Sequence, residues 1–83
     1  MDIKKIRKFL KNEREESNFT QQDVAERLGV SKAVISKWEC GKAYPSLEYL
    51  PKLSELYGVS INEILAGSRL SISDKESFAD EIY

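Results

Sequence analysis

Four side chains at helical spacing offer the clearest chemistry in this sequence. They are Lys32, Ala33, Ser36 and Lys37. In a helix over residues 32–39 they would share the face opposite Ile35 and Trp38, which leaves them free of any role in the core. Lysine can donate hydrogen bonds to guanine O6 and N7, and alanine can contact a thymine methyl group. This face is therefore chemically suited to nucleic acid, and a solvated lysine-bearing helix is the ordinary alternative.

The groups on which enzymes and metal sites depend are scarce in the chain. It contains no histidine, no cluster of metal ligands and no glycine-rich phosphate loop. A serine–lysine dyad could be drawn on paper, but short helices offer no strained site for a nucleophile. A redox role for Cys40 is disfavoured because the chain has no second cysteine. We therefore predict a protein that is not an enzyme and that uses neither a cofactor nor a metal ion.

The composition is that of one small globular domain. The chain has 83 residues, of which 41% are hydrophobic and 33% charged. Its single cysteine favours a reducing compartment. No apolar run approaches the roughly 18 residues of a membrane span, and no apolar stretch follows the lysine-rich start to make a signal peptide. We therefore predict a cytoplasmic location.

Charge is unevenly distributed along the chain, although the formal net charge is only -1. Residues 1–42 hold ten Lys or Arg against seven Asp or Glu, whereas residues 43–83 hold three against seven. This asymmetry is compatible with one half that faces phosphates. A basic patch stands near the start, at Lys4, Lys5, Arg7 and Lys8. For that patch a solvated helix face is the favoured interpretation, and phosphate contact is the second.

Apolar spacing and capping residues divide the chain into five short helices, with no strand pattern. The predicted helices cover residues 2–16, 21–28, 32–39, 47–57 and 61–66, and Gly29, Gly41, Gly58 and Gly67 each end one of them. Pro51 is expected to bend or shorten the first turn of the fourth helix. The core stripe of that helix is predicted to be Leu47, Leu50, Leu53, Leu56 and Tyr57.

The segment 21–40 has the residue pattern of two helices that cross steeply over a tight turn. Ala25 would allow the helices to approach, and Gly29 would permit a positive φ where a β-carbon is penalised. The inner faces would be buried by Val24, Leu28, Val30, Ile35 and Trp38.

This segment, QQDVAERLGVSKAVISKWEC, resembles the helix-turn-helix of the phage-repressor and Cro family, also called the XRE family. The match extends through Phe19-Thr20-Gln21, Gly41-Lys42, Pro45-Ser46 and residues 56–60, and covers about residues 3–67. The resemblance implies an all-α, five-helix lambda-repressor-like domain over residues 1–67. It also implies a recognition helix in the major groove of double-stranded DNA and, usually, a homodimer on a near-palindromic site.

Residue by residue, the resemblance assigns contacts with bases and with phosphates. Base contacts fall to Lys32, Ala33 and Lys37, and Val34 could also meet a thymine methyl group. Phosphate contacts fall to Ser31, Ser36, Lys42 and Tyr44. Gln21 resembles a glutamine that grips a phosphate and also braces the recognition helix.

Further positions match or depart from the family pattern. Arg14 and Glu39 match a semi-buried ion pair that ties the first helix to the recognition helix. Cys40 stands where a polar or basic residue is common, which removes one expected phosphate contact. Asn18 replaces a glycine and tolerates a left-handed φ. Glu13 replaces a core leucine, so we expect a thinner core at that end.

Residues 68–83 lie outside the resemblance and are predicted to dimerise the protein or to link it to a further region. The sequence from Ser73 to Glu76 has the pattern of a capping box, and Phe78, Ala79 and Ile82 follow as an apolar stripe. One more C-terminal helix is therefore expected there.

These observations together predict a transcription regulator, a repressor, that binds double-stranded DNA sequence-specifically and associates with the nucleoid when bound. The alternative is a protein-interaction module, such as an antitoxin-like adaptor, that keeps the same fold. The acidic pI of about 5.5 favours this alternative slightly, whereas the lysine-bearing face of residues 32–37 favours DNA.

Overall fold

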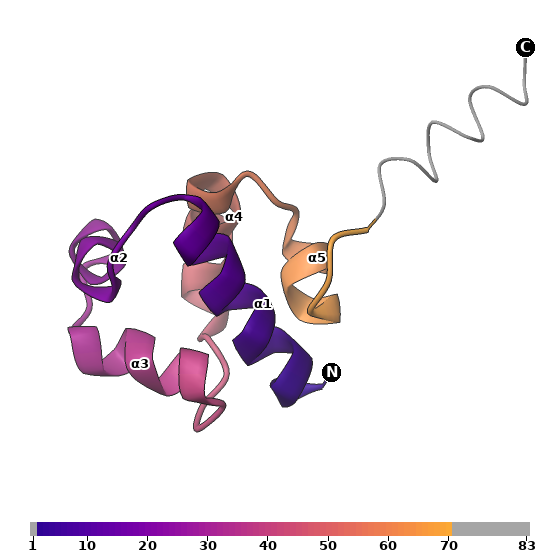
Figure 1. The fold of residues 1–83 in the computed structure, drawn as a ribbon, viewed down its shortest axis with the longest axis horizontal. Coiled ribbons are helices and arrows are strands. Elements are labelled where there is room, and N and C mark those ends of the chain that lie inside the picture. The colour runs from indigo at the N-terminus through magenta and orange to yellow at the C-terminus, as the bar shows by residue number, and fades with distance from the viewer. Residues whose placement is uncertain (1, 71–83) are drawn as a thin grey trace, which may run out of the picture.

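The computed structural model describes residues 2–70, which form five α-helices and one short 3-10 helix without a strand (Figure 1). The helices are α1 (Ile3–Glu16), α2 (Gln21–Leu28), α3 (Lys32–Cys40), η1 (Leu47–Tyr49), α4 (Leu50–Tyr57) and α5 (Ile61–Ala66). None of the helices in this range is long and apolar enough to cross a membrane. The all-α prediction is confirmed for these residues, and the helix expected after Ser73 lies outside them.

Side-chain caps set most of the helix boundaries. Thr20 and Asp23 form a capping box at α2, in which the Asp23 amide donates to Thr20 Oγ1 and the Thr20 amide donates to Asp23 Oδ2. Ser60 and Glu63 form the same motif at α5. Each box satisfies backbone amides that have no partner inside the helix. Asp2 caps α1, so that helix begins one residue later than predicted.

The fourth predicted helix is divided in two, which corrects the sequence interpretation. Residues 47–49 form the 3-10 helix, and α4 begins at Leu50 with Pro51 in its first turn. A proline lacks the amide needed for a hydrogen bond to the preceding turn, so the α-helix does not extend backwards through it. Leu47 is consequently out of register with the α4 stripe and is 80% exposed rather than part of the core.

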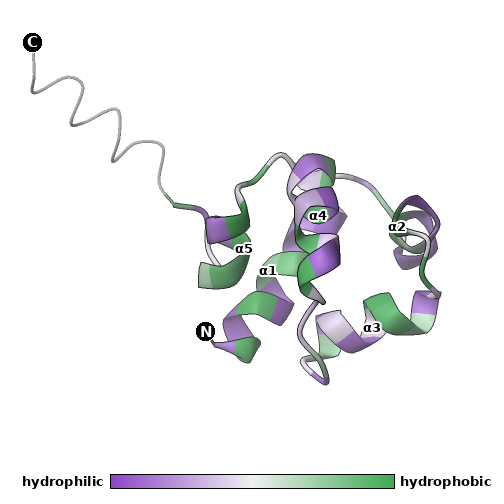
Figure 2. Ribbon diagram, turned by 180° about the vertical axis from the view of Figure 1, so that it is seen from behind, coloured by the Kyte–Doolittle hydropathy of each residue, from purple (hydrophilic) through white to green (hydrophobic). Residues whose placement is uncertain are grey.

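The core collects the apolar faces of all five α-helices around α1, which crosses the middle of the domain (Figures 1 and 2). α1 packs against α3 on one side and α5 on the other, and α2 packs against α3. Ile6, Ile35, Leu53 and Ile64 are each almost completely buried. α3 is therefore held from behind by α1 and α2, and one of its faces is left to solvent.

Candidate nucleic-acid interface

The turn between α2 and α3 takes a left-handed conformation at its glycine. Gly29 has a φ of 74°, and a β-carbon added there would meet no atom within 4 Å. Glycine is needed for the backbone angle and not for space. Ala25 is 1% exposed, and its carbonyl accepts a hydrogen bond from the Val30 amide. The two helices are thus held close together by a short side chain and a tight turn.

The side chains of α3 are divided between a buried and an open face. Ile35, Trp38 and Glu39 are buried against α1 and α2. The three residues predicted to contact bases, Lys32, Ala33 and Lys37, are all exposed, while Val34 and Ser36 are half-buried. The open face therefore carries Lys32 and Lys37, and no carboxylate within residues 2–70 forms an ion pair with either of them.

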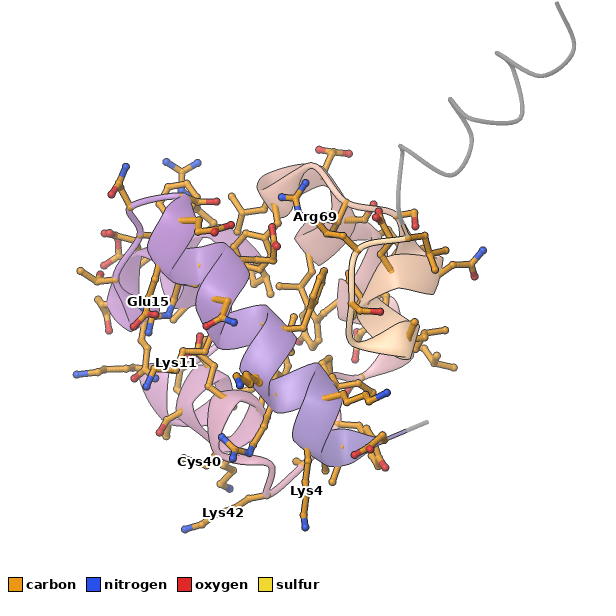
Figure 3. All side chains as sticks on the ribbon, turned by 45° about the vertical axis from the view of Figure 1, so that its right-hand side comes forward. Lys4, Lys11, Glu15, Cys40, Lys42 and Arg69 are labelled. Carbon is orange, nitrogen blue, oxygen red and sulfur yellow. The ribbon has the colours of Figure 1, made fainter. Side chains whose placement is uncertain are left out.

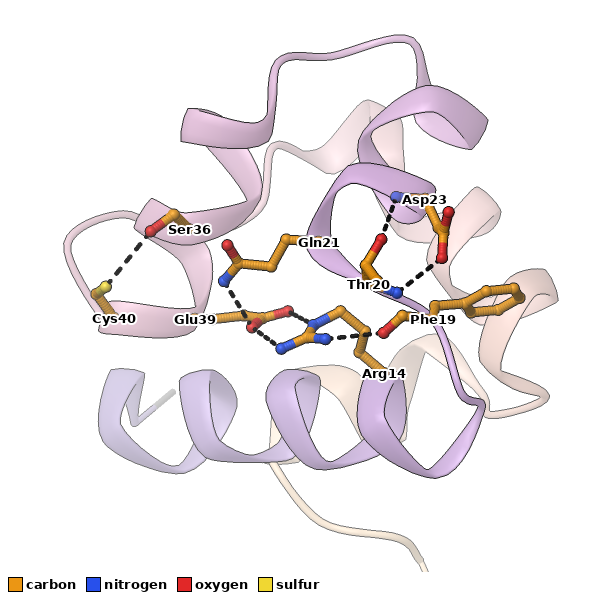
Figure 4. Close-up of polar contacts among 8 residues, drawn as sticks. All are labelled: Arg14, Phe19, Thr20, Gln21, Asp23, Ser36, Glu39 and Cys40. Carbon is orange, nitrogen blue, oxygen red and sulfur yellow. Dashed lines mark hydrogen bonds and ion pairs between the residues drawn. The ribbon is translucent and has the colours of Figure 1, made fainter.

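A polar network centred on Glu39 fixes the position of α3 (Figure 4). Arg14 donates from Nε to Glu39 Oε2 at 2.7 Å and from Nη2 to Oε1 at 3.0 Å, and its Nη1 donates to the Phe19 carbonyl at 2.8 Å. Gln21 Nε2 donates to Glu39 Oε1 at 3.1 Å. The hydrogen bond with Glu39 raises the pKa of Arg14, against the opposing effect of burial. One carboxylate thus joins α1, α2 and α3.

Four of the five residues predicted to contact phosphates lie near the two ends of α3. Ser31 caps the start of the helix, where its Oγ accepts from the Val34 amide and leaves the hydroxyl hydrogen available. The Nε2 of Gln21 likewise has a second hydrogen beyond the one it donates to Glu39. Lys42 and Tyr44 are exposed just after the helix, and Figure 3 shows Lys42 pointing away from the body of the molecule.

Two residues of this region have features less suited to phosphate contact. Ser36 is half-buried, and its Oγ lies 3.8 Å from Cys40 Sγ on the next turn. Cys40 is exposed as a free thiol. Within residues 2–70 no three His, Cys, Asp or Glu side chains are grouped so that they could hold a metal ion.

A second buried ion pair was missed by the sequence interpretation. Glu13, where a thinner core was expected, is 5% exposed, and both its carboxylate oxygens accept from Arg69, at 2.7 and 3.0 Å. The Leu70 amide also donates to Glu63. Arg69 and Leu70, which follow α5, are therefore attached to α1 and α5. The only signal in the sequence was an unpaired glutamate at an apolar helix position.

The comparisons with known proteins agree with this geometry. The family described as helix-turn-helix matches residues 10–64. The chain belongs to the XRE-type helix-turn-helix family. This confirms the resemblance seen in the sequence, and because members are DNA-binding transcription regulators, it also confirms that the chain is not an enzyme.

Relatives from bacteria and their phages carry names of transcription regulators. The chain is 49% identical over 53 residues to the HTH-type transcriptional activator BcrR of Enterococcus faecalis, covering 64% of the chain and 26% of that protein. It is 37% identical over 62 residues to the cryptic phage CTXphi transcriptional repressor RstR of Vibrio cholerae (75% and 56%). It is also 37% identical over 71 residues to the SPbeta prophage-derived regulator YonR of Bacillus subtilis (86% and 66%). The chain thus spans between about a quarter and two thirds of these relatives.

Proposed function

We propose that this chain is the DNA-binding domain of a transcription regulator and reads double-stranded DNA sequence-specifically with residues 31–39 in the major groove. The observation that carries the proposal is the open face of α3, where Lys32, Ala33 and Lys37 are exposed while the opposite face is anchored by the Glu39 network. A groove-reading helix needs both an unobstructed outer face and a fixed orientation. Membership of the helix-turn-helix family supports the same conclusion.

The individual contacts follow from donor chemistry. Lys32 and Lys37 donate to guanine O6 and N7, and Ala33 and Val34 contact thymine methyl groups. Phosphates are bound near the two ends of α3 by Gln21, Ser31, Lys42 and Tyr44. Ser36, predicted for the same role, lies half-buried in the middle of the helix and contributes less. Base contacts specify the sequence, whereas phosphate contacts position the helix and respond to salt.

A homodimer on a near-palindromic operator gives this domain enough selectivity. One recognition helix reads only a few base pairs, so two subunits are needed on half-sites about one helical turn apart. Ile61 and Leu70 are exposed and are available for a dimer contact, whereas Ile64, in the same helix as Ile61, is fully buried. Deletion of residues 71–83, which belong to the segment predicted to dimerise the protein, would test the share of that segment by sedimentation.

Repression in the cytoplasm is the regulatory outcome that we propose. A domain bound across a promoter blocks polymerase with no further contact, and one of the relatives, RstR, is named a repressor. The relative BcrR is named an activator. A promoter–reporter assay with the selected operator separates the two outcomes by the sign of the change in transcription.

The DNA-binding proposal is tested by selecting bound sequences from a random duplex pool and comparing two variants on them. We expect Lys37→Ala to weaken binding by about 1–3 kcal/mol and to relax preference at one or two base pairs. Lys42→Ala should weaken all sequences about equally. If neither variant alters binding while the fold is retained, the assigned face is wrong. A chain that shows no salt-dependent binding to random duplex would instead favour the protein-interaction alternative.

A further inference from the structure

We propose that α1 carries a second DNA-backbone contact, formed by Lys4 and Arg7 and continuous with Lys42 at the end of the recognition helix. This inference rests on the proposed function and extends the interface beyond α2, α3 and the loop after α3. The sequence alone favoured a solvated helix face for these cations, and the packing of α1 changes that interpretation. We call Lys4 and Arg7 the α1 patch.

Four of the five cations between residues 4 and 11 form two pairs on different sides of α1. Lys5 and Lys8 line a hollow with Gly67 on the α5 side. Arg7 lies on the α3 side, since a β-carbon built on Gly41 would be 2.9 Å from Arg7 Cδ and 3.7 Å from its Nε. Lys4 lies within one helical turn of both Arg7 and Lys8, and Figure 3 shows it at the edge of the molecule where Lys42 lies. Lys4 with Arg7 and Lys5 with Lys8 are thus two pairs of equal charge with different neighbours.

The α1 patch adjoins the end of the recognition helix. Gly41 is the residue that ends α3, and Lys42 follows it directly. Figure 3 shows Lys4 from α1 and Lys42 from the loop at the same lower edge of the molecule, Lys4 pointing down and Lys42 to the lower left. Arg7 lies over Gly41 between α1 and this loop. Three cations from two distant stretches of the chain thus gather at one edge.

Within the described residues these cations are not neutralised. Lys4, Arg7 and Lys42 are exposed, and the ion pairs formed within residues 2–70 use Arg14 and Arg69 instead. The carboxylate of Asp2, close in sequence to the patch, accepts from the Lys4 and Lys5 amides as the α1 cap. The patch therefore retains its positive charge for a partner.

The dimensions of DNA identify that partner as a phosphate backbone. A helix of nine residues such as α3 is about 13 Å long, and the major groove is about 12 Å wide. A recognition helix of this length has its end close to a groove edge, where phosphates lie. The cations beside Gly41 are then within reach of the backbone that borders the groove, whereas Ser31 stands at the other end of the helix.

The test compares two double variants with the same loss of charge on the same helix. Lys4→Gln with Arg7→Gln removes the α1 patch, and Lys5→Gln with Lys8→Gln removes the other pair. Binding to the selected operator and to random duplex is measured by fluorescence anisotropy over a salt series. We expect the first variant to lower the log–log salt slope by about 2 per subunit and to weaken both duplexes by the same factor. The second should leave the slope close to that of the unaltered chain.

The controls separate this inference from the function on which it rests. Arg7→Lys keeps the charge and should retain the slope, and thermal unfolding should be unchanged because the altered side chains are exposed. If the two double variants had equal salt slopes, the α1 patch would be contradicted. The proposed function would still stand in that case if Lys37→Ala relaxed base preference. An unaltered chain that does not bind DNA would overturn the proposed function and this inference together.

Discussion

Two glutamates are buried in this domain, and the contrast between them shows which interactions can be anticipated from a motif. Glu39 lies in the helix-turn-helix and receives Arg14 and Gln21, while Glu13 lies in α1 and receives Arg69. Both carboxylates are almost inaccessible, with 4% and 6% of their side chains exposed. Their partners differ, because 12% of the Arg14 side chain is exposed against 54% for Arg69.

This difference predicts that the two pairs contribute unequally to stability. Removing one member of a pair that excludes water leaves a charge without compensation, whereas a half-exposed partner can be replaced by solvent. The Glu39 pair also orients α3, the proposed recognition helix, and the Glu13 pair attaches Arg69 to α1. We therefore expect the first pair to affect both stability and DNA reading and the second to affect stability alone.

The largest effect is expected for Arg14→Ala. The variant leaves Glu39 buried with only Gln21 as a hydrogen-bond donor, so the free energy of unfolding should fall by about 3 kcal/mol. Urea denaturation measures this change, and a double-mutant cycle with Glu39→Gln isolates the pair. Zero coupling in that cycle would show that the two side chains do not act together. DNA selection with the variant should also show weaker base preference.

A smaller effect is expected for Arg69→Ala. Water can reach the Glu13 carboxylate through the space left by a half-exposed side chain, so we expect a loss of about 1–2 kcal/mol. Arg69→Lys keeps the charge but not the two parallel hydrogen bonds, so its loss of stability should lie between zero and that of Arg69→Ala. Base preference should be unaffected in both variants. A loss as large as that of Arg14→Ala would remove the proposed difference between the two pairs.

The smallest effect is expected at Glu63, which holds the same segment as Arg69. Hydrogen bonds from the Ser60 amide, and more weakly from Leu70, hold the pKa of Glu63 below its ordinary value of 4.5. A carboxyl that is more acidic in the folded state stabilises the fold above pH 4.5, and this contribution is lost as the pH falls below that value. Glu63→Gln should therefore flatten the dependence of the melting temperature on pH between about 5 and 3.

Asp23 provides the matched variant for this experiment. Its pKa is lowered by the Thr20 amide in the same way, but it stands in the capping box of α2 and holds no segment after α5. Asp23→Asn should flatten the dependence of the melting temperature on acidic pH but should leave the hydrogen bond at Leu70 intact. Hydrogen exchange at the Leu70 amide distinguishes the two variants, and equal exchange in both would show that Glu63 does not hold that segment.

Much of the fold could be predicted from the sequence because its signals are local. Thr20 with Asp23 and Ser60 with Glu63 are three residues apart, and the contacts they make in the structure span that same interval. Gly29 predicts a turn because glycine readily takes the positive φ that the turn has in the structure. Helix caps and turns of this kind depend on neighbouring residues only, so their residue types are sufficient to predict them. The face of α3 could be anticipated for the same reason, since helical spacing separates Lys32 and Lys37 from Ile35.

The remaining features were decided by the tertiary structure, because they depend on how distant segments approach. Arg69 and Glu13 are 56 positions apart, and no pattern along the chain relates them. Leu47 follows the leucine spacing of α4 yet is exposed, because the 3-10 turn before Pro51 changes its direction. Arg7 lies beside Gly41 only because α1 packs against α3. The sequence by itself determined most of the helix boundaries, except the division before Pro51, and which face of α3 is open. The packing of α1 against α3 and α5 decided which charges are buried and which remain at the surface.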